Sequence, residues 1–187
     1  MESDEDLIVA HVAGDENAFP RLVGRHLKTV YSFAFHFVGN SSDAEDISQE
    51  SFLKVWKNLK RYSSEHARFK TWLMRIVRNT AIDYLRKRKD IPLSSFEDDD
   101  GKNVLADIPD ETPLPEELLI KKYEANEIEL AARELPPLYR EVLLLYYGDD
   151  RTLRETADIL NISSNTVKSR HRRALAALRK MLMHPKR

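Results

Sequence analysis

The sequence predicts an all-α protein with two small helical domains joined by a flexible acidic linker. Apolar residues recur at the helical period both before residue 90 and after residue 116. The stretch between them, IPLSSFEDDDGKNVLADIPDETPLP, is acidic, contains prolines and has no period, which is typical of a linker. A helix-turn-helix pattern follows near the carboxyl end. We therefore expect a first domain at 1–90, a linker at 91–117 and a second domain at 118–187.

The charge of the chain is small in total but strongly segregated. The 187 residues carry a formal net charge of −1. Residues 60–89 are rich in Lys and Arg, residues 97–117 are acidic, and the carboxyl-terminal tail is basic. Such blocks favour a nucleic-acid-binding protein whose acidic part is kept apart from its basic surfaces. The absence of cysteine excludes disulfides, thiolate catalysis and zinc-thiolate sites.

The sequence favours neither a membrane protein nor an enzyme. It has no run of about twenty apolar residues, and MESDEDLIVAH lacks the basic start and apolar core of a signal peptide. We therefore expect a cytoplasmic protein that does not insert into a membrane. The histidines show no E-x-x-H or H-x-x-x-H spacing, and no P-loop or Gly-rich dinucleotide motif occurs. We expect no catalytic residue, no metal and no cofactor.

Two helices are expected before residue 40. Ser3 is placed to cap the first helix, with acidic residues in its first turn and Gly14 after its end. The second helix ends at Gly39 and carries a series of apolar residues that includes Leu27. Pro20 predicts that this helix starts near Asn17 or kinks at the proline.

The next helix, at 43–59, carries two stripes. Its inward face holds Ile47, Ser51, Phe52, Val55 and Leu59, with Trp56 at the margin. The second stripe holds Asp46, Gln49, Glu50 and Leu53 at i, i+3, i+4 and i+7. This mixture of acids, an amide and a leucine fits either a docking surface for a basic helix or a solvated face.

A polar loop at 60–70 leads into a basic helix for which Thr71 is a possible cap. Arg75, Arg78, Asn79 and Arg86 lie opposite its apolar face, and Tyr62, Phe69 and Trp72 lie at its head. Basic and aromatic side chains together suit single-stranded DNA, because bases stack on rings while phosphates meet cations. For Phe69 and Trp72, a place in the core is the alternative to stacking.

The second domain ends in the helix-turn-helix pattern at 153–182. Helices at 116–135 and 138–147 precede it, separated by Pro136-Pro137. Asn161 suits a left-handed turn, and Ser163 or Ser164 can cap the last helix. The outward residues Asn165, Lys168, Ser169, Arg172 and Arg173 suit phosphates and base edges in a major groove. No acid occurs from 164 to 187, so we expect the basic charge to be unopposed. A solvated helical hairpin is the alternative.

The motifs DAEDISQESFLKVW, FKTWLMRIVRNTAIDYLRKRK, LPPLYREVLLLYY and LRETADILNISSNTVKSRHRRAL occur in this order. In order and spacing they resemble the extracytoplasmic-function group of bacterial RNA polymerase sigma factors. The resemblance covers nearly the whole chain apart from the linker. It implies an alternative sigma factor that binds core RNA polymerase and directs promoter recognition and melting.

The resemblance also implies roles for individual residues. The clamp coiled coil of the largest polymerase subunit would contact Asp46, Gln49, Glu50, Leu53 and Trp56. Single-stranded DNA of the minus-10 element would contact Tyr62, Phe69, Arg75, Arg78, Asn79 and Arg86, with Asn79 near a pocket for a flipped base. Double-stranded DNA of the minus-35 element would contact Asn165, Thr166, Lys168, Ser169, Arg172 and Arg173. An anti-sigma factor is the expected regulatory partner.

Several departures from the family pattern, among them Pro20 and a leucine at Leu175 where arginine is common, and one alternative function accompany this interpretation. His171 stands where the family has an aliphatic residue, either at the edge of the core or at the DNA interface. Asn165 stands where glycine is common, so base preference does not transfer. The alternative function is a helix-turn-helix transcriptional activator, which would need a dimer surface or a sensor domain.

Overall fold

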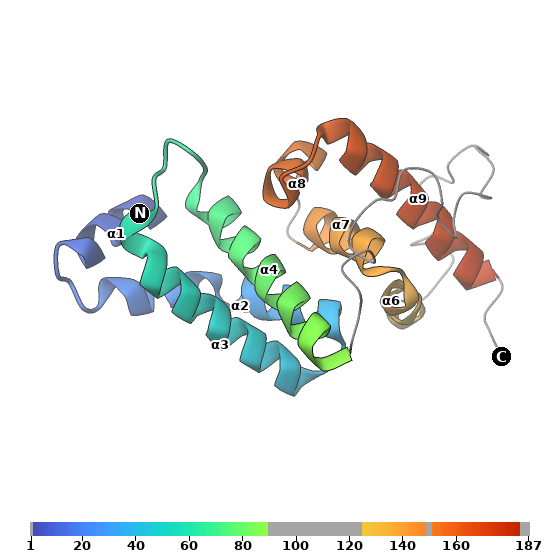
Figure 1. Ribbon diagram of the computed structural model, residues 1–187, viewed down its shortest axis with the longest axis horizontal. Helices are drawn as coiled ribbons and strands as arrows, with labels where there is room; N and C mark the ends of the chain where they lie inside the picture. The colour runs from blue at the N-terminus through green and yellow to red at the C-terminus, as the bar shows by residue number, and fades with distance from the viewer. Residues whose placement is uncertain (1, 90–124, 149–150, 184–187) are drawn as a thin grey trace. The chain divides into compact units, whose positions relative to one another are not determined.

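The computed structural model describes residues 2–89, 125–148 and 151–183, and within these ranges all of the regular structure is helical. This result confirms the predicted all-α fold. The chain divides into two compact units, which hold α1 to α4 and α6 to α9 (Figure 1). The expected linker at 91–117 lies outside the described residues.

Ser3 caps helix α1 (Asp4–Val12), as predicted, and the structure adds a reciprocal hydrogen bond that makes a capping box with Asp6. The Asp6 N–H donates to Ser3 Oγ over 3.0 Å, and the Ser3 N–H donates to Asp6 Oδ2 over 2.8 Å. The backbone hydrogen bond from Ser3 is the main reason that the pKa of Asp6 lies below its ordinary value. Gly14 follows the helix with a φ of 107°, a backbone conformation that residues other than glycine rarely adopt, and it allows the turn into α2.

Helix α2 (Ala18–Val38) starts directly after Asn17, which confirms the first of the two predictions for Pro20. The proline lies in the first turn, where its missing N–H removes no intrahelical hydrogen bond. Among the apolar residues of this helix, Leu27 is 48% exposed. His26 takes the buried position instead, one turn from both Leu22 and Val30.

Helix α3 (Ser41–Asn58), the 3₁₀ turn η1 (Leu59–Arg61) and helix α4 (Phe69–Lys89) complete the first unit. The inward face predicted for the 43–59 helix is buried throughout. The side chain of Asn40 caps α3 by accepting the Asp43 N–H over 2.8 Å. Helix α4 starts before Thr71, so the prediction that Thr71 caps it is wrong. Helices α2, α3 and α4 pack pairwise against one another.

A buried carboxylate ties the start of α3 to the end of α4. Asp43 is only 3% exposed. It accepts a hydrogen bond from the Tyr84 hydroxyl over 2.6 Å and one from the Asn40 amide over 2.5 Å, and it forms an ion pair with Arg88. These partners compensate the cost of removing the carboxylate from water. The contacts fix the register of the two helices whose outer faces carry the predicted binding residues.

The second unit contains α6 (Ala125–Glu134), α7 (Pro137–Tyr147), α8 (Leu153–Leu160) and α9 (Ser164–Met183). Both α6 and α7 pack against α9. Their shared core consists of Leu135, Leu138, Tyr139, Leu143, Ala174, Ala177 and Leu178. The part of the predicted 116–135 helix that precedes Ala125 lies outside the described residues.

The turn between α8 and α9 has the predicted helix-turn-helix geometry. Asn161 adopts a left-handed conformation, with φ 55° and ψ 44°, and the next residue's N–H donates to the Ala157 carbonyl over 3.2 Å. Ser163, rather than Ser164, caps α9, because its Oγ accepts the Thr166 N–H over 3.0 Å. The sequence therefore determined this turn locally.

Candidate functional site

The first candidate surface is the acidic face of α3, which consists of Asp46, Gln49, Glu50, Leu53 and Trp56. All five side chains are exposed. Leu53 is 56% exposed and Trp56 is 52% exposed, although both are large and apolar. The structure therefore brings the predicted set together on the outside of one helix. An exposed tryptophan and leucine beside carboxylates fit the composition of a protein interface better than that of a purely solvated face.

Lys54 connects the acidic face of α3 to α4. Its ammonium nitrogen lies 2.9 Å from Glu50 Oε1 and donates to Thr80 Oγ1 over 3.1 Å. Thr80 belongs to α4 and is buried. The Glu50 side chain is 48% exposed, so water screens this ion pair and the carboxylate remains accessible to a partner.

An open groove of about 690 Å³ between α2 and α3 borders the acidic face at Gln49. Its apolar lining includes Leu27 and Tyr31 of α2 and Phe52 of α3. The exposed side chain of Leu27 lies on the wall of this groove.

The second candidate surface is the basic face of α4, which consists of Arg75, Arg78, Asn79 and Arg86. Asn79 and Arg86 are exposed, and the two other arginines are partly exposed. The guanidinium of Arg78 donates to Asn79 Oδ1 over 3.3 Å. Arg86 has an exposed ion pair with Asp83, at 3.7 Å. Such exposed contacts are weak, so phosphate groups of DNA can replace Asn79 and Asp83 as the partners of these two arginines.

The aromatic residues at the head of α4 differ in their exposure. Phe69 is 1% exposed, and its ring packs against those of His26, Tyr62 and Trp72. Of the two places expected for Phe69, the structure therefore shows the one in the core, because neighbouring rings cover it. Tyr62 and Trp72 are partly exposed, with ring centroids 5.3 Å apart. Tyr62 remains a candidate for contact with a base.

The Tyr62 hydroxyl is held from two directions. It donates to the Ala67 carbonyl over 3.0 Å and lies 3.2 Å from Glu5 Oε1. Burial, followed by the charge of Glu5 and the hydrogen bond to it, raises the pKa of Tyr62 to about 12. The phenol is therefore neutral at physiological pH and donates a hydrogen bond at the base of the loop.

The third candidate surface is the outer face of α9, which consists of Asn165, Thr166, Lys168, Ser169, Arg172 and Arg173. Asn165, Lys168, Arg172 and Arg173 are exposed. Thr166 is partly buried, and its hydroxyl lies 2.8 Å from Ser163 Oγ within the cap. The first turns of α9 therefore present cations and an amide on one exposed side, as reading of a major groove requires.

The expectation of unopposed basic charge along α9 is wrong at Arg170, because this buried residue faces the buried Glu141 of α7. Sequence reasoning placed neither residue. The available signal was a single acid, preceded by one arginine, in the otherwise apolar stretch LYREVLLLYY. A buried acid requires a cation or a set of donors, and Arg170 lies one turn from the inward Val167.

His171 lies at the edge of the core, in accordance with the first of its two expected places. Its ring packs at 4.8 Å from the Tyr146 ring and 5.7 Å from the Tyr147 ring. The Tyr147 hydroxyl lies 2.9 Å from His171 Nε2. The imidazole therefore contributes to packing between α7 and α9.

Among the helices of the described ranges, none is both long and apolar enough to span a membrane.

Comparison with known proteins supports the same organisation. Residues 22–91 match the family model for Sigma-70 region 2, and residues 125–178 match the model for Sigma-70, region 4. The chain is 36% identical over 174 residues to the ECF RNA polymerase sigma factor SigW of Bacillus subtilis, which covers 90% of this chain and 91% of SigW. It is 30% identical over 168 residues to SigX of the same organism, covering 88% of this chain and 84% of SigX.

Solved structures share the fold. The structure of CnrH in complex with the cytosolic domain of CnrY has a TM-score of 0.68 and 23% identity, and the match covers 98% of this chain and 99% of the other. The sigma factor RpoE from Bartonella quintana, in complex with the anti-sigma factor NepR, has a TM-score of 0.63 and 23% identity, covering 90% and 98%. Because both family models and full-length relatives match, the chain belongs to the extracytoplasmic-function family of RNA polymerase sigma factors and is an alternative sigma factor.

Proposed function

We propose that this sigma factor binds core RNA polymerase through the acidic face of α3 and recognises promoter DNA through the basic face of α4 and the outer face of α9. The observation that carries the docking role is the exposure of Leu53 and Trp56 on the same helix face as the carboxylates of Asp46 and Glu50. The natural partner for such a surface is a helix with basic and apolar side chains, such as one from the clamp coiled coil of the largest polymerase subunit. The relatives give no support to the activator alternative.

The basic face of α4, with Tyr62, is the proposed site for single-stranded DNA of the minus-10 element. Arginines attract the backbone phosphates, and the amide of Asn79 can both donate to and accept from a base. Unstacking a base during melting costs a few kcal/mol, and the protein must offset this free energy with new contacts. We assign Asn79 and the Tyr62–Lys70 loop to that pocket. Phe69 supports the site from the core rather than as a contact.

The outer face of α9 is the proposed site for double-stranded DNA of the minus-35 element. Its cations give affinity that depends on salt, and its base contacts give sequence choice. Each domain alone binds weakly. A linker at 91–117 between domains at 1–90 and 118–187 gives the second contact a high effective concentration once the first is made.

Two further proposals follow from the family. The matched RpoE and CnrH structures contain protein partners, and for RpoE the partner is an anti-sigma factor. We propose that an anti-sigma factor also regulates this chain. We also propose that it acts in the cytoplasm, as a non-enzymatic subunit without cofactor or metal.

The test is run-off transcription with purified bacterial core polymerase, with and without this protein, on a genomic promoter library at a stated salt concentration. New transcripts that share a two-part upstream motif would support the proposal and identify the promoter. Absence of new start sites, together with no binding to core polymerase, would contradict it. In that case a palindromic site for an activator would be the next target.

A further inference from the structure

Helix α1 contacts the loop that leads into α4, although the two are far apart in the sequence. The Tyr62 hydroxyl lies 3.2 Å from the Glu5 carboxylate and 3.0 Å from the Ala67 carbonyl. A phenol has a single proton, so these two acceptors share one donor. The hydroxyl is therefore held both by the loop itself and by α1. Helix α1 precedes the segment that matches Sigma-70 region 2, which starts at residue 22.

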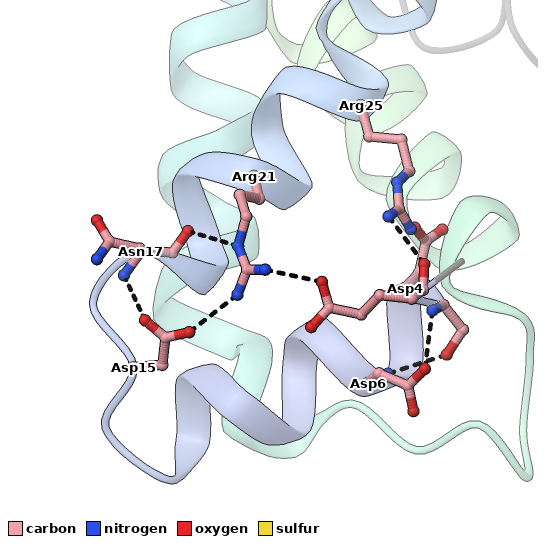
Figure 2. Close-up of polar contacts among 8 residues, drawn as sticks. Asp4, Asp6, Asp15, Asn17, Arg21 and Arg25 are labelled. Atoms are coloured by element: carbon pink, nitrogen blue, oxygen red, sulfur yellow. Dashed lines mark hydrogen bonds and ion pairs between the residues drawn. The ribbon is translucent and has the colours of Figure 1, made fainter.

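A second set of contacts connects Asp4, the residue before Glu5, to the aromatic rings of Phe69 and Tyr62. The imidazole of His26 donates to Asp4 Oδ2 over 2.8 Å, and Arg25 donates to Asp4 Oδ1 over 2.6 Å (Figure 2 shows the Arg25 contact). His26 is buried, and its ring centroid lies 5.4 Å from that of Phe69. The Phe69 ring in turn lies 5.7 Å from the Tyr62 ring. The contacts thus connect Asp4 through His26, Phe69 and Tyr62 to Glu5, which follows Asp4 in the chain.

Other ion pairs of this region connect α2 to the segments on either side of α1 and do not involve the loop. Arg21 pairs with Glu2 at 2.8 Å and with Asp15 at 2.9 Å (Figure 2 labels Arg21 and Asp15). The three side chains are between 39% and 49% exposed. Glu2 therefore offers a matched control for Glu5: it is an acid of the same region with an ion pair to α2.

We propose that Glu5 is a positioning residue for promoter melting: through its hydrogen bond to Tyr62, it holds the loop at the head of α4 in the conformation that receives single-stranded DNA. The inference rests on the proposed DNA-binding role of that loop. Holding a loop in its bound conformation before the ligand arrives removes an ordering cost from binding. The amino-terminal helix α1 thereby becomes part of the downstream DNA-binding site without touching DNA.

The test uses the complete chain bound to purified core polymerase. The probe is a fluorescein-labelled single-stranded oligonucleotide with the non-template minus-10 sequence of a promoter found by run-off transcription. Glu5→Ala should weaken its binding about three- to tenfold, the range expected for one hydrogen bond. Glu5→Gln keeps an acceptor oxygen and should recover most of the affinity. Glu2→Ala should bind the oligonucleotide as the wild type does.

A double-mutant cycle tests whether Glu5 affects DNA binding through the Tyr62 hydroxyl. If Glu5 acts by holding the Tyr62 hydroxyl, Glu5→Ala combined with Tyr62→Phe should bind no more weakly than the weaker single variant. Additive losses, or failure of Glu5→Gln to recover affinity, would overturn the positioning role. Unchanged binding by Glu5→Ala would also overturn it. Tyr62→Phe removes the donor of the same hydrogen bond. If Glu5→Ala proves unstable, the affinity of Tyr62→Phe for the oligonucleotide still tests the proposal.

Failure of the proposed function gives a different result. If the wild-type complex binds the oligonucleotide no better than core polymerase alone, the role of the loop in DNA binding is wrong and the inference falls with it. If the wild type binds and only the comparison among the variants fails, the proposed function stands and the positioning role of Glu5 is rejected. Core-polymerase affinity, measured in parallel, should be the same for the wild type and every variant.

Discussion

Glu141 Oε1 of α7 lies 3.7 Å from Arg170 Nη1 of α9, and the two side chains are 0% and 7% exposed. Each charge has been removed from water, so each depends on the other to offset its lost hydration. The pair lies on the inner side of α9, while Lys168 and Arg172 face outward on the same helix. A single helix therefore uses one arginine to fix its position and others to meet DNA.

We expect Glu141→Ala to destabilise the second unit by about 3–5 kcal/mol, because it leaves the Arg170 guanidinium buried without its carboxylate. Hydrogen exchange of peptides from α7 and α9 measures this change. Both tryptophans, Trp56 and Trp72, lie in the first unit, so their fluorescence does not report on the second. Arg173→Ala, at an exposed position, should change stability by less than about 0.5 kcal/mol. Wild-type exchange in Glu141→Ala would contradict the role of the pair.

We expect Asp46→Ala combined with Glu50→Ala to weaken binding to core polymerase by at least about tenfold, because both charges are lost from the proposed docking surface. Fluorescence anisotropy of the labelled protein measures the affinity. Glu2→Ala with Glu16→Ala changes net charge equally away from the acidic face of α3 and should bind normally. Equal affinities of the two double variants would exclude a docking role for the acidic face.

We expect Arg172→Ala to weaken binding to the upstream promoter element by about 1–3 kcal/mol if the guanidinium reads a base. If it meets only a phosphate, affinity should fall for all sequences, and the slope of log K against log salt should decrease by about 1. Lys180→Ala, in the last turn of α9, is the control. Loss of core-polymerase binding by Arg172→Ala would contradict the assignment of α9 to DNA.

The pKa of Tyr62 provides a direct test of its contact with Glu5. The folded value of about 12 lies above the ordinary value of 10.0, so the neutral phenol stabilises the fold below pH 10, and this contribution is lost as the pH rises through 12. Glu5→Gln removes a negative charge near the phenol and should lower this pKa. An NMR titration of ring-labelled tyrosine, started at pH 9 and continued beyond the wild-type value of about 12, measures it. An unchanged pKa in Glu5→Gln would show that the two groups do not interact, and Glu2→Gln is the matched control.

The candidate surfaces were largely predictable because each lies along one helix. Helical spacing placed the outer face of α9 and the first four residues of the acidic face of α3, whereas Trp56 came from the family resemblance. The structure exposes all five residues of the acidic face. Phe69 could not be placed by spacing, because core aromatics and stacking aromatics occupy the same positions at a helix start. Its burial depends on rings from α2 and from the preceding loop.

The sequence by itself determined the features that depend on neighbouring residues in the chain: the capping box of Ser3 and Asp6, the left-handed turn at Asn161, and the helical periods. Only the tertiary structure decided which groups meet across long separations. His26 is buried against Asp4 and Phe69, and Glu5 reaches Tyr62, because packing of α1 and α4 around α2 brings these segments together. Local propensity acts over a few residues, whereas the partner of a buried or shared polar group is chosen by the packing of whole helices.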